Sequence, residues 1–450
     1  MKLSPNHSNA ASELLKFSKF GKGIGLHRMH WIIKQMQNPE WTSNLDVLKI
    51  TGSKGKGSTS VLCSIFLSKL GLRVGLFTSP HLLRFNERIK IDGVDISDEH
   101  LSESWENFRA KEAMYNRLFP GDTFGSFEAF TAVAFDAFES HRVDAVVSEA
   151  GIGGRYDSTR PFPGRTVALT SVELEHTELL GNSTELIAYD KADLCPSGGT
   201  LIVGNIDKEI IRRLRSFCAI RSVNLLIPDS EISDIAFSEN KMEFSLKCIG
   251  LDFGRLRTSL LGEHQAGNIS LAVTATWNWL SRNRPNITKE ELKAAAIEAI
   301  SEVHWPGRLQ TVHKDPLVVI DVGHTPQSMH SVALTVKEAY PETPILLLTG
   351  VSKDKNLVGI LSELVPIASL VICSCPYHKG TAAEQVAEVC RSLTDGVEVI
   401  AVEKIEDAVG EAIRRAREGK MMVLVAGGLF LAIEAMIAAE GGDPAALLFA

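Results

Sequence analysis

The clearest arrangement of apolar and polar positions in the chain lies between residues 47 and 71. An apolar run at 47–50 predicts a buried strand, a glycine-rich segment follows it, and apolar residues then recur at helical spacing as far as Gly71. Glycines allow backbone N–H groups to approach phosphate oxygens at the positive end of a following helix. The pattern therefore predicts a phosphate cradle, which comprises Gly52, Gly55, Lys56, Gly57, Ser58 and Thr59.

The side chains of this loop suit a nucleotide bound together with magnesium. Lys56 can bridge the terminal phosphates, and Ser58 or Thr59 can offer a hydroxyl group to a Mg²⁺ ion that the phosphates also hold. The loop departs from the G-x-x-x-x-G-K-[ST] pattern because its lysine precedes the last glycine. Taken alone, it fits either a nucleotide site or an ordinary glycine–serine turn.

Strands and helices alternate along the chain as far as about residue 304. The predicted helices lie at 26–36, 101–118 and 126–138, and the predicted strands at 73–79, 143–148, 166–172 and 200–203. Polar residues at 79–88 follow the second strand, at the edge of an open α/β sheet where ligands bind. Short alternating runs between about 227 and 261 predict a small antiparallel insert.

Two polar side chains of this region follow predicted strands. Glu149 would face the phosphate loop, as suits a carboxylate that holds magnesium, although a carboxylate that caps a helix or a turn is the alternative. His176 by itself is more typical of a packed or surface histidine than of a metal ligand.

The spacing changes near His304, where proline and glycine precede a second α/β rhythm. Five further strands are predicted, at 317–321, 345–349, 370–373, 397–402 and 422–426. Strands that alternate with helices predict a Rossmann-like domain, and the absence of G-x-G-x-x-G gives no reason to expect a dinucleotide. We therefore expect two domains, at residues 1–305 and 306–450.

Composition narrows the class of protein. The chain has 450 residues, 44% of them hydrophobic, and a net charge of −8, which argues against general nucleic-acid binding. Seven cysteines without a C-x-x-C pair predict neither a disulfide framework nor a zinc site, and a reducing compartment fits best. The apolar run at 421–433 is too short to span a membrane, and no signal peptide is evident. We expect a cytoplasmic monomer that acts on small molecules.

Further motifs accompany the phosphate loop along the chain. They are GSKGKGS (52–58), TSPHLLRFNERI (78–89), EAGIGGRYDST (149–159), HTELLG (176–181), the lysine of DKADL (190–194), GEHQAGN (262–268), WPGR (305–308), DVGHTP (321–326) and KDKN (353–356). In this order they resemble the folylpolyglutamate synthase/dihydrofolate synthase branch of the Mur ligase superfamily. The resemblance implies a P-loop-containing central α/β domain and a C-terminal Rossmann-like domain.

The resemblance also implies an activity, ATP-dependent amide formation through an acyl phosphate. The implied amine is L-glutamate, and the implied acid is dihydropteroate or a folate glutamate. The implied cofactors are ATP and two Mg²⁺ ions, one of them near a carbamylated Lys191. For Lys191 the alternative is an ordinary solvated lysine.

Site residues are carried over motif by motif. The resemblance assigns catalysis to Lys56, Lys191 and His324; nucleotide contacts to Asn268, Arg308 and Asp321 besides the loop; metal binding to Ser58, Ser79, Glu149 and His176; and acceptor binding to His81, Leu82, Arg84 and Phe85.

Several positions depart from the family pattern and leave the substrate open. They are Ser53 and Lys54, Arg160, Glu175, Thr325, His378 to Gly380, and Gly428. One alternative is a divergent ligase for another acid or amino acid, and another is a non-catalytic nucleotide-binding protein. The retained Lys56, Glu149, His176 and Lys191 favour a ligase.

Overall fold

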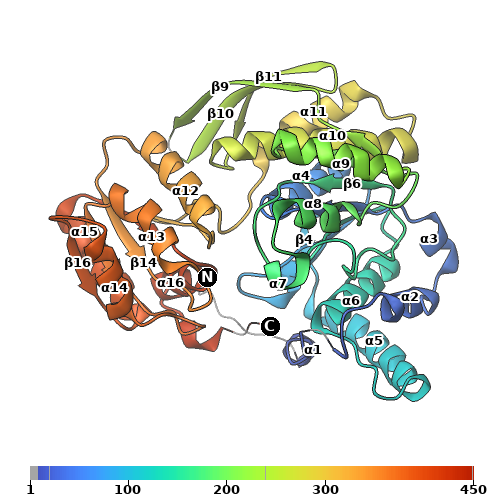
Figure 1. Cartoon of the computed structure of the whole chain (residues 1–450), viewed down its shortest axis with the longest axis horizontal. Coiled ribbons are helices and arrows are strands. Elements are labelled where there is room, and N and C mark those ends of the chain that lie inside the picture. The colour runs from blue at the N-terminus through green and yellow to red at the C-terminus, as the bar shows by residue number, and fades with distance from the viewer. Residues whose placement is uncertain (1–8, 20, 239, 448, 450) are drawn as a thin grey trace.

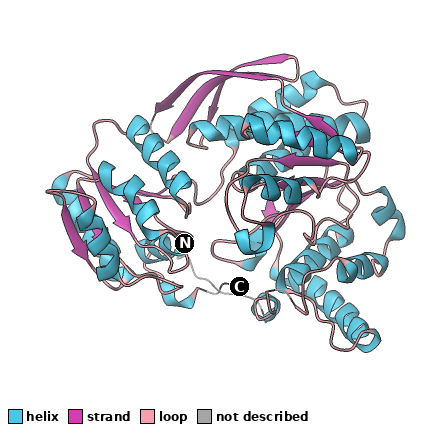
Figure 2. Ribbon diagram, viewed as in Figure 1, coloured by secondary structure: helices cyan, strands magenta, loops and turns pink. Residues whose placement is uncertain are grey.

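The computed structural model describes residues 9–19, 21–238, 240–447 and 449. They form two lobes, each with helices packed around a sheet, and a slender antiparallel sheet lies above both (Figures 1 and 2). The predicted domain boundary at 305/306 stays a prediction.

The first lobe is built on a sheet with eight strands among the described residues. These are β1 (Leu48–Thr51), β2 (Val74–Phe77), β3 (Ile89–Ile91), β4 (Val94–Asp95), β5 (Ala145–Glu149), β6 (Thr166–Leu169), β7 (Thr200–Val203) and β8 (Asn224–Leu226). The spatial order is β4-β3-β2-β5-β1-β6-β7-β8, and only β3 runs opposite to the other strands, because it is antiparallel to both of its neighbours, β2 and β4. The first two predicted strands are therefore parallel but not neighbours, because β5 lies between them.

Helices cover both faces of this sheet. They are α1 (Asn9–Leu14), α2 (His27–Lys34), α3 (Pro39–Asn44), α4 (Lys56–Lys69), α5 (Asp98–Leu118), α6 (Ser126–Ser140), α7 (Thr177–Leu180), α8 (Thr184–Ala192), α9 (Lys208–Ile220), α10 (Glu263–Asn283) and α11 (Lys289–Glu302), with a 3₁₀ helix η1 (Phe85–Arg88). The central strands β1, β5 and β6 are buried along their whole length, as parallel strands covered on two faces must be.

The predicted insert region contains a three-stranded antiparallel sheet. Its strands are β9 (Ser230–Ser238), β10 (Lys241–Cys248) and β11 (Leu251–Thr258). At one end of this sheet Asn240 accepts hydrogen bonds from Thr311 Oγ1 and Tyr340 Oη of the second lobe, each 2.7 Å long. The insert thereby connects the two lobes at a point remote in sequence from the linker.

The second lobe has a six-stranded sheet, in the order β12-β13-β17-β14-β15-β16. Its elements are β12 (Gln310–Lys314), β13 (Leu317–Ile320), α12 (Pro326–Ala339), β14 (Ile345–Thr349), α13 (Leu357–Leu364), η2 (Val365–Ile367), β15 (Leu370–Cys373), α14 (Ala383–Ser392), β16 (Glu398–Ala401), α15 (Ile405–Gly419), β17 (Met422–Val425), α16 (Leu429–Ala439) and η3 (Pro444–Ala446). The five predicted strands are present and parallel, which confirms the α/β prediction. The antiparallel edge strand β12 was not predicted.

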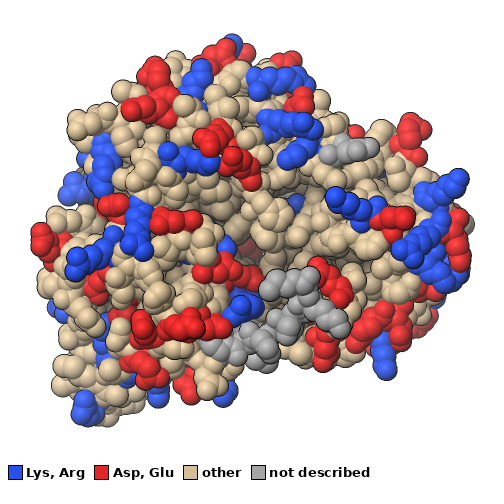
Figure 3. All heavy atoms as spheres, turned by 180° about the vertical axis from the view of Figure 1, so that it is seen from behind, with Lys and Arg blue, Asp and Glu red and all other residues tan. Residues whose placement is uncertain are grey.

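The surface gives little sign of a single charged field. Basic and acidic side chains are interspersed over the face seen from behind (Figure 3). Within the described part of the chain, no helix is both long and apolar enough to cross a membrane. The seven cysteines, all of them described, have free thiols.

Candidate active site

The phosphate loop joins β1 to α4. Gly55 is the N-cap of α4 with φ +80°, and Lys56 begins the helix. A Cβ atom on Gly55 would lie 2.5 Å from Asn268 Oδ1, so α10 closes one side of the loop. The Lys56 amine donates a hydrogen bond to Gly52 O at 2.9 Å. The predicted loop residues and Asn268 therefore lie together, and the positively charged Lys56 amine is held over the loop.

Residues 170 and 171, which directly follow the neighbouring strand β6, form hydrogen bonds to the phosphate loop. The Ser53 amide donates to Ser171 O at 2.9 Å, and the Lys54 amide donates to Ser171 Oγ at 2.8 Å. Thr170 Oγ1 in turn donates to Lys54 O at 2.5 Å. Because β1 and β6 are parallel, their carboxyl ends meet, and the chain leaving β6 holds the loop rigid.

Glu149 lies at the same edge of the sheet, as predicted. It is opposite Ile50 in the register of β1 and β5, and its side chain is 3% exposed. Its carboxylate accepts one long hydrogen bond, 3.3 Å, from the Ser79 amide. Burial raises the pKa of Glu149 to about 7, although the positive charges of Lys56 and Arg308 oppose this. A buried carboxylate so weakly compensated is suited to a divalent cation.

Hydroxyl groups at the start of α4 can serve the same ion. Ser58 is buried on the first turn of α4, and the neighbouring Thr59 Oγ1 has no hydrogen-bond partner among the described residues. Nowhere in the described residues are three His, Cys, Asp or Glu side chains grouped as a metal site. Magnesium would therefore depend on hydroxyl and phosphate oxygens in addition to Glu149.

Lys191 lies at the end of α8 and is 1% exposed. Its amine is paired with Glu175 at 2.9 Å. Although burial favours the neutral acid, the positive charges of Lys191 and Lys56 lower the pKa of Glu175 to about 2. Burial lowers the pKa of Lys191, despite the nearby carboxylate. Lys191 is therefore not an ordinary solvated lysine, and its charge is sensitive to its surroundings.

His176 is exposed at the N-cap of α7, with φ +45°. Although the residue is exposed, partial desolvation of its ring lowers its pKa, which favours the neutral imidazole that can bind a metal. His176 directly follows Glu175, the partner of Lys191. The structure therefore places both residues at the same edge of the sheet. Its part in metal binding stays a prediction.

The second lobe contributes three predicted residues that face the phosphate loop. Asp321 is 6% exposed and accepts hydrogen bonds from the Leu309 and Gly323 amides, at 3.1 and 2.7 Å. Burial raises the pKa of Asp321, and Arg308 opposes that rise. Burial, with the positive charge of Lys54, lowers the pKa of His324 to about 3. His324 is therefore neutral and can exchange hydrogen bonds but is a weak base.

The linker between the lobes passes over the phosphate loop. A Cβ atom on Gly57 would lie 3.0 Å from the Trp305 indole, three residues before Arg308. The charge of Lys54 also contributes to the pKa of both Asp321 and His324. The structure therefore brings the predicted nucleotide residues of both lobes to one place.

The predicted acceptor residues differ in exposure: His81 and Phe85 are buried, whereas Arg84 is partly exposed. His81 is 1% exposed and accepts a hydrogen bond on Nδ1 from Arg88 Nε at 2.8 Å. Phe85 is fully buried in the lobe and packs edge-on against Phe130, with ring centroids 5.0 Å apart. Arg84 forms an exposed ion pair with Asp98 at 2.8 Å, and Leu82 packs against the second lobe. Phe85 and Arg84 thus already have structural partners, and the contact of these residues with substrate stays a prediction.

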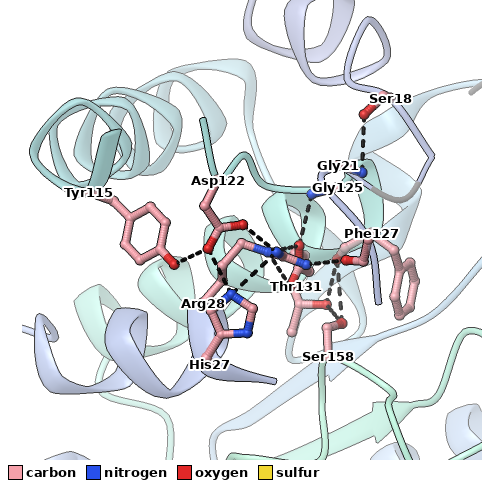
Figure 4. Close-up of polar contacts among 12 residues, drawn as sticks. Ser18, Gly21, His27, Arg28, Tyr115, Asp122, Gly125, Phe127, Thr131 and Ser158 are labelled. Atoms are coloured by element: carbon pink, nitrogen blue, oxygen red, sulfur yellow. Dashed lines mark hydrogen bonds and ion pairs between the residues drawn. The ribbon is translucent and has the colours of Figure 1, made fainter. Parts of the chain in front are cut away.

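A buried ionic cluster beside the site was missed from the sequence (Figure 4). Arg28 is 2% exposed, pairs with Glu128 at 2.8 Å and with Asp122 at 2.7 Å, and donates to Gly23 O at 2.5 Å. Tyr115 Oη also donates to Asp122, at 2.6 Å. The cluster fixes the segment before α2 on the α5–α6 connection. The sequence signal that could have indicated this cluster is the position of Arg28 on the apolar side of the predicted helix at 26–36.

The helix that carries Glu128 also reaches the turn that follows Glu149. A Cβ atom on Gly151 would lie 2.6 Å from the Phe127 ring, and Thr131 Oγ1 lies 2.5 Å from Ser158 Oγ. Phe127 therefore contacts the turn that follows Glu149. The start of α6 connects the Arg28 cluster to the candidate site.

Gly55→Ala is expected to weaken ATP binding about tenfold or more, since the new methyl group displaces Asn268 from the loop. Gly71→Ala is a matched control, because Gly71 also has a positive φ, +83°, but a Cβ atom there has no neighbour within 4 Å. Calorimetric titration with ATP measures both variants. Equal affinities in the two variants would contradict the packing of Asn268 on the loop.

Comparison with known proteins identifies the family. The model of the Mur ligase, glutamate ligase domain matches residues 307–429. The chain is 30% identical over 423 residues to "Dihydrofolate synthase/folylpolyglutamate synthase" of Bacillus subtilis (strain 168), covering 92% of this chain and 94% of that protein. The chain belongs to the dihydrofolate synthase/folylpolyglutamate synthase family. The Mur ligase-like fold and the ATP-dependent ligase class predicted from the motifs are thereby confirmed.

Other members of the family differ in length and in distance. A "Probable bifunctional folylpolyglutamate synthase/dihydropteroate synthase" of Halobacterium salinarum is 31% identical over 431 residues, and the chain spans about half, 51%, of its length. The solved structure of "Mycobacterium tuberculosis Folylpolyglutamate synthase complexed with ADP" superposes with a TM-score of 0.84 at 24% identity, covering 96% of this chain and 98% of that one. At this identity the superposition supports the fold.

Proposed function

We propose that this dihydrofolate synthase/folylpolyglutamate synthase family member joins L-glutamate to the carboxylate of a dihydropteroate or folate acceptor. The observation that supports this most is the meeting of the phosphate loop, Glu149 and the Lys191–Glu175 pair with Arg308 and Asp321 of the other lobe. Such a site can hold ATP by its phosphates while a second molecule approaches its γ-phosphate.

The proposed ligation consists of two group transfers, first of the γ-phosphoryl group of ATP to the acceptor carboxylate and then of the acyl group to the glutamate amine. An acceptor carboxylate oxygen bonds to the γ-phosphorus of ATP, the bond to the β-phosphate oxygen breaks, and ADP leaves. The glutamate amine then bonds to the acyl carbon, phosphate leaves, and the amine loses its proton. Charge moves onto phosphate oxygens in both steps, so fixed cations are the main requirement.

The chain's own residues supply these cations and exclude water. Lys56 can exchange Gly52 O for a phosphate oxygen, and Arg308 reaches the same place from the linker. Asp321 is positioned by two backbone amides to accept hydrogen bonds from the nucleotide. Contact between the lobes keeps water from the acyl phosphate.

Magnesium, when bound, supplies positive charge to the transferring phosphate. We propose that Ser58, Ser79 and Glu149 hold one ion, and that His176 and a carbamate on Lys191 hold a second. The lowered pKa of buried Lys191 supports the carbamate, because the neutral amine is the form that reacts with CO₂. Two ions, a monomeric state and a cytoplasmic location remain predictions.

The test is ATP turnover with Mg²⁺ and L-glutamate, with dihydropteroate, tetrahydrofolate or no acceptor, and the product mass read directly. A mass increase of one glutamyl unit on either pterin is the expected result and identifies the step. ADP release with neither acceptor, despite ATP binding, would reject the folate acceptor and direct the search to another acid.

A further inference from the structure

Phe449 connects the two lobes through aromatic rings. Its ring centroid lies 4.7 Å from that of His81, in the loop after β2, and 5.1 Å from that of Phe430 in α16. On the other side of this contact, His378 stacks on Phe430 with centroids 5.4 Å apart. We call His378, Phe430, Phe449 and His81 the aromatic row. It runs from the second lobe, where α16 lies on the side that faces the first (Figure 1), to the proposed acceptor loop.

An apolar contact accompanies the aromatic row. Leu447 is 1% exposed and packs with Ile433 and Ile437 of α16, and Leu82 and Leu83 pack against this cluster from the first lobe. The turn before it is fixed, because the Ala445 amide donates to Asp443 Oδ1 at 3.0 Å. Leu447 and Phe449 therefore contact consecutive residues of the same loop, His81, Leu82 and Leu83.

His81 transmits this contact toward the proposed chemistry. Arg88 Nε donates to His81 Nδ1 at 2.8 Å, so the imidazole proton is on Nε2 and the ring is neutral. The Arg88 guanidinium lies 4.8 Å from the centroid of Phe130, and its charge contributes to the pKa of Glu149. Ser79, two residues before His81, donates its amide to the same carboxylate. A displacement of His81 would therefore move both Ser79 and Arg88, at the two ends of the loop, relative to Glu149.

From this geometry we infer that Phe449 is a positioning residue for the acceptor. It holds residues 79–88 in the conformation that binds the acceptor, and it does so through His81 without touching the nucleotide. The inference rests on the proposed function in that the acceptor is taken to bind at this loop. The nucleotide residues Lys56, Asn268 and Arg308 are outside the aromatic row, so loss of Phe449 is expected to change ATP binding less than acceptor binding.

The test compares Phe449→Ala with the conservative Phe449→Tyr, which keeps the ring. Losing the ring contacts is expected to raise the KM for the acceptor about tenfold, with the KM for ATP and kcat changed less than twofold. Phe449→Tyr should restore the acceptor KM to within about twofold of the starting protein. Phe119→Ala is a matched control, since that ring is 46% exposed at the end of α5.

Hydrogen exchange in the ligand-free protein provides a readout that needs no substrate. Amides of residues 79–88 should exchange faster in Phe449→Ala than in the Phe119→Ala control, with the phosphate loop unchanged. If no folate acceptor is used, the proposed function fails while this measurement still decides the role of Phe449. Unchanged exchange at 79–88, or an equal rise in the KM of ATP and acceptor together with a lower melting temperature, would overturn the inference.

Discussion

Lys191→Ala is expected to lower turnover about 10³-fold while ATP binding is retained. Lys191 is 1% exposed and 2.9 Å from Glu175, so its removal leaves a partly buried carboxylate, 19% exposed, without its cation. In the proposed carbamate form, the same change removes an anionic oxygen ligand from the second ion. The phosphate loop and Asn268 do not depend on Lys191 for their hydrogen bonds, which is why nucleotide affinity should survive.

Steady-state kinetics and calorimetric ATP binding measure the two effects separately. Lys208→Ala is a suitable control, because that lysine is exposed at the start of α9. Carbon NMR in ¹³C-bicarbonate should show a carbamate signal that Lys191→Ala lacks, and a short carboxylic acid such as acetate should partly restore turnover. Turnover in Lys191→Ala equal to that of Lys208→Ala would remove Lys191 from the mechanism.

Arg28→Met is expected to reduce the free energy of unfolding by about 3 kcal/mol, the cost of leaving buried charges unpaired. The methionine roughly keeps the volume of the stem but not the guanidinium that joins Glu128, Asp122 and Gly23 O. The two carboxylate side chains are only 12% and 26% exposed, so water replaces the arginine poorly. Urea unfolding followed by circular dichroism measures the change.

An exposed ion pair of the same lobe provides the control. Arg212, on α9, is 69% exposed and pairs with Glu209, which is 52% exposed, so Arg212→Met should cost at most about 1 kcal/mol. Combining Arg28→Met with Glu128→Gln should recover part of the loss, because the double change removes one unpaired charge. A loss for Arg28→Met no larger than that for Arg212→Met would show that the cluster does not hold the segment before α2.

The sequence by itself determined the local features of this ligase. The phosphate loop was predictable because glycine spacing and the adjoining strand and helix are encoded within about 25 residues, and backbone conformation there depends on near neighbours. The position of Glu149 at the carboxyl edge of the sheet was predictable for a similar reason, since it ends a buried strand. The motif order then identified the family before any contact was known.

Tertiary structure alone decided which distant side chains meet. Arg28 is separated from Asp122 by 94 residues, and no local pattern marks the pair. Phe85 was predicted to lie at the acceptor, which stays a prediction, and only the structure shows that it packs against Phe130 inside the lobe. Phe449 meets His81 from the opposite end of the sequence. Such contacts follow from the burial of apolar area over the whole chain, and short-range sequence patterns carry no record of the partner.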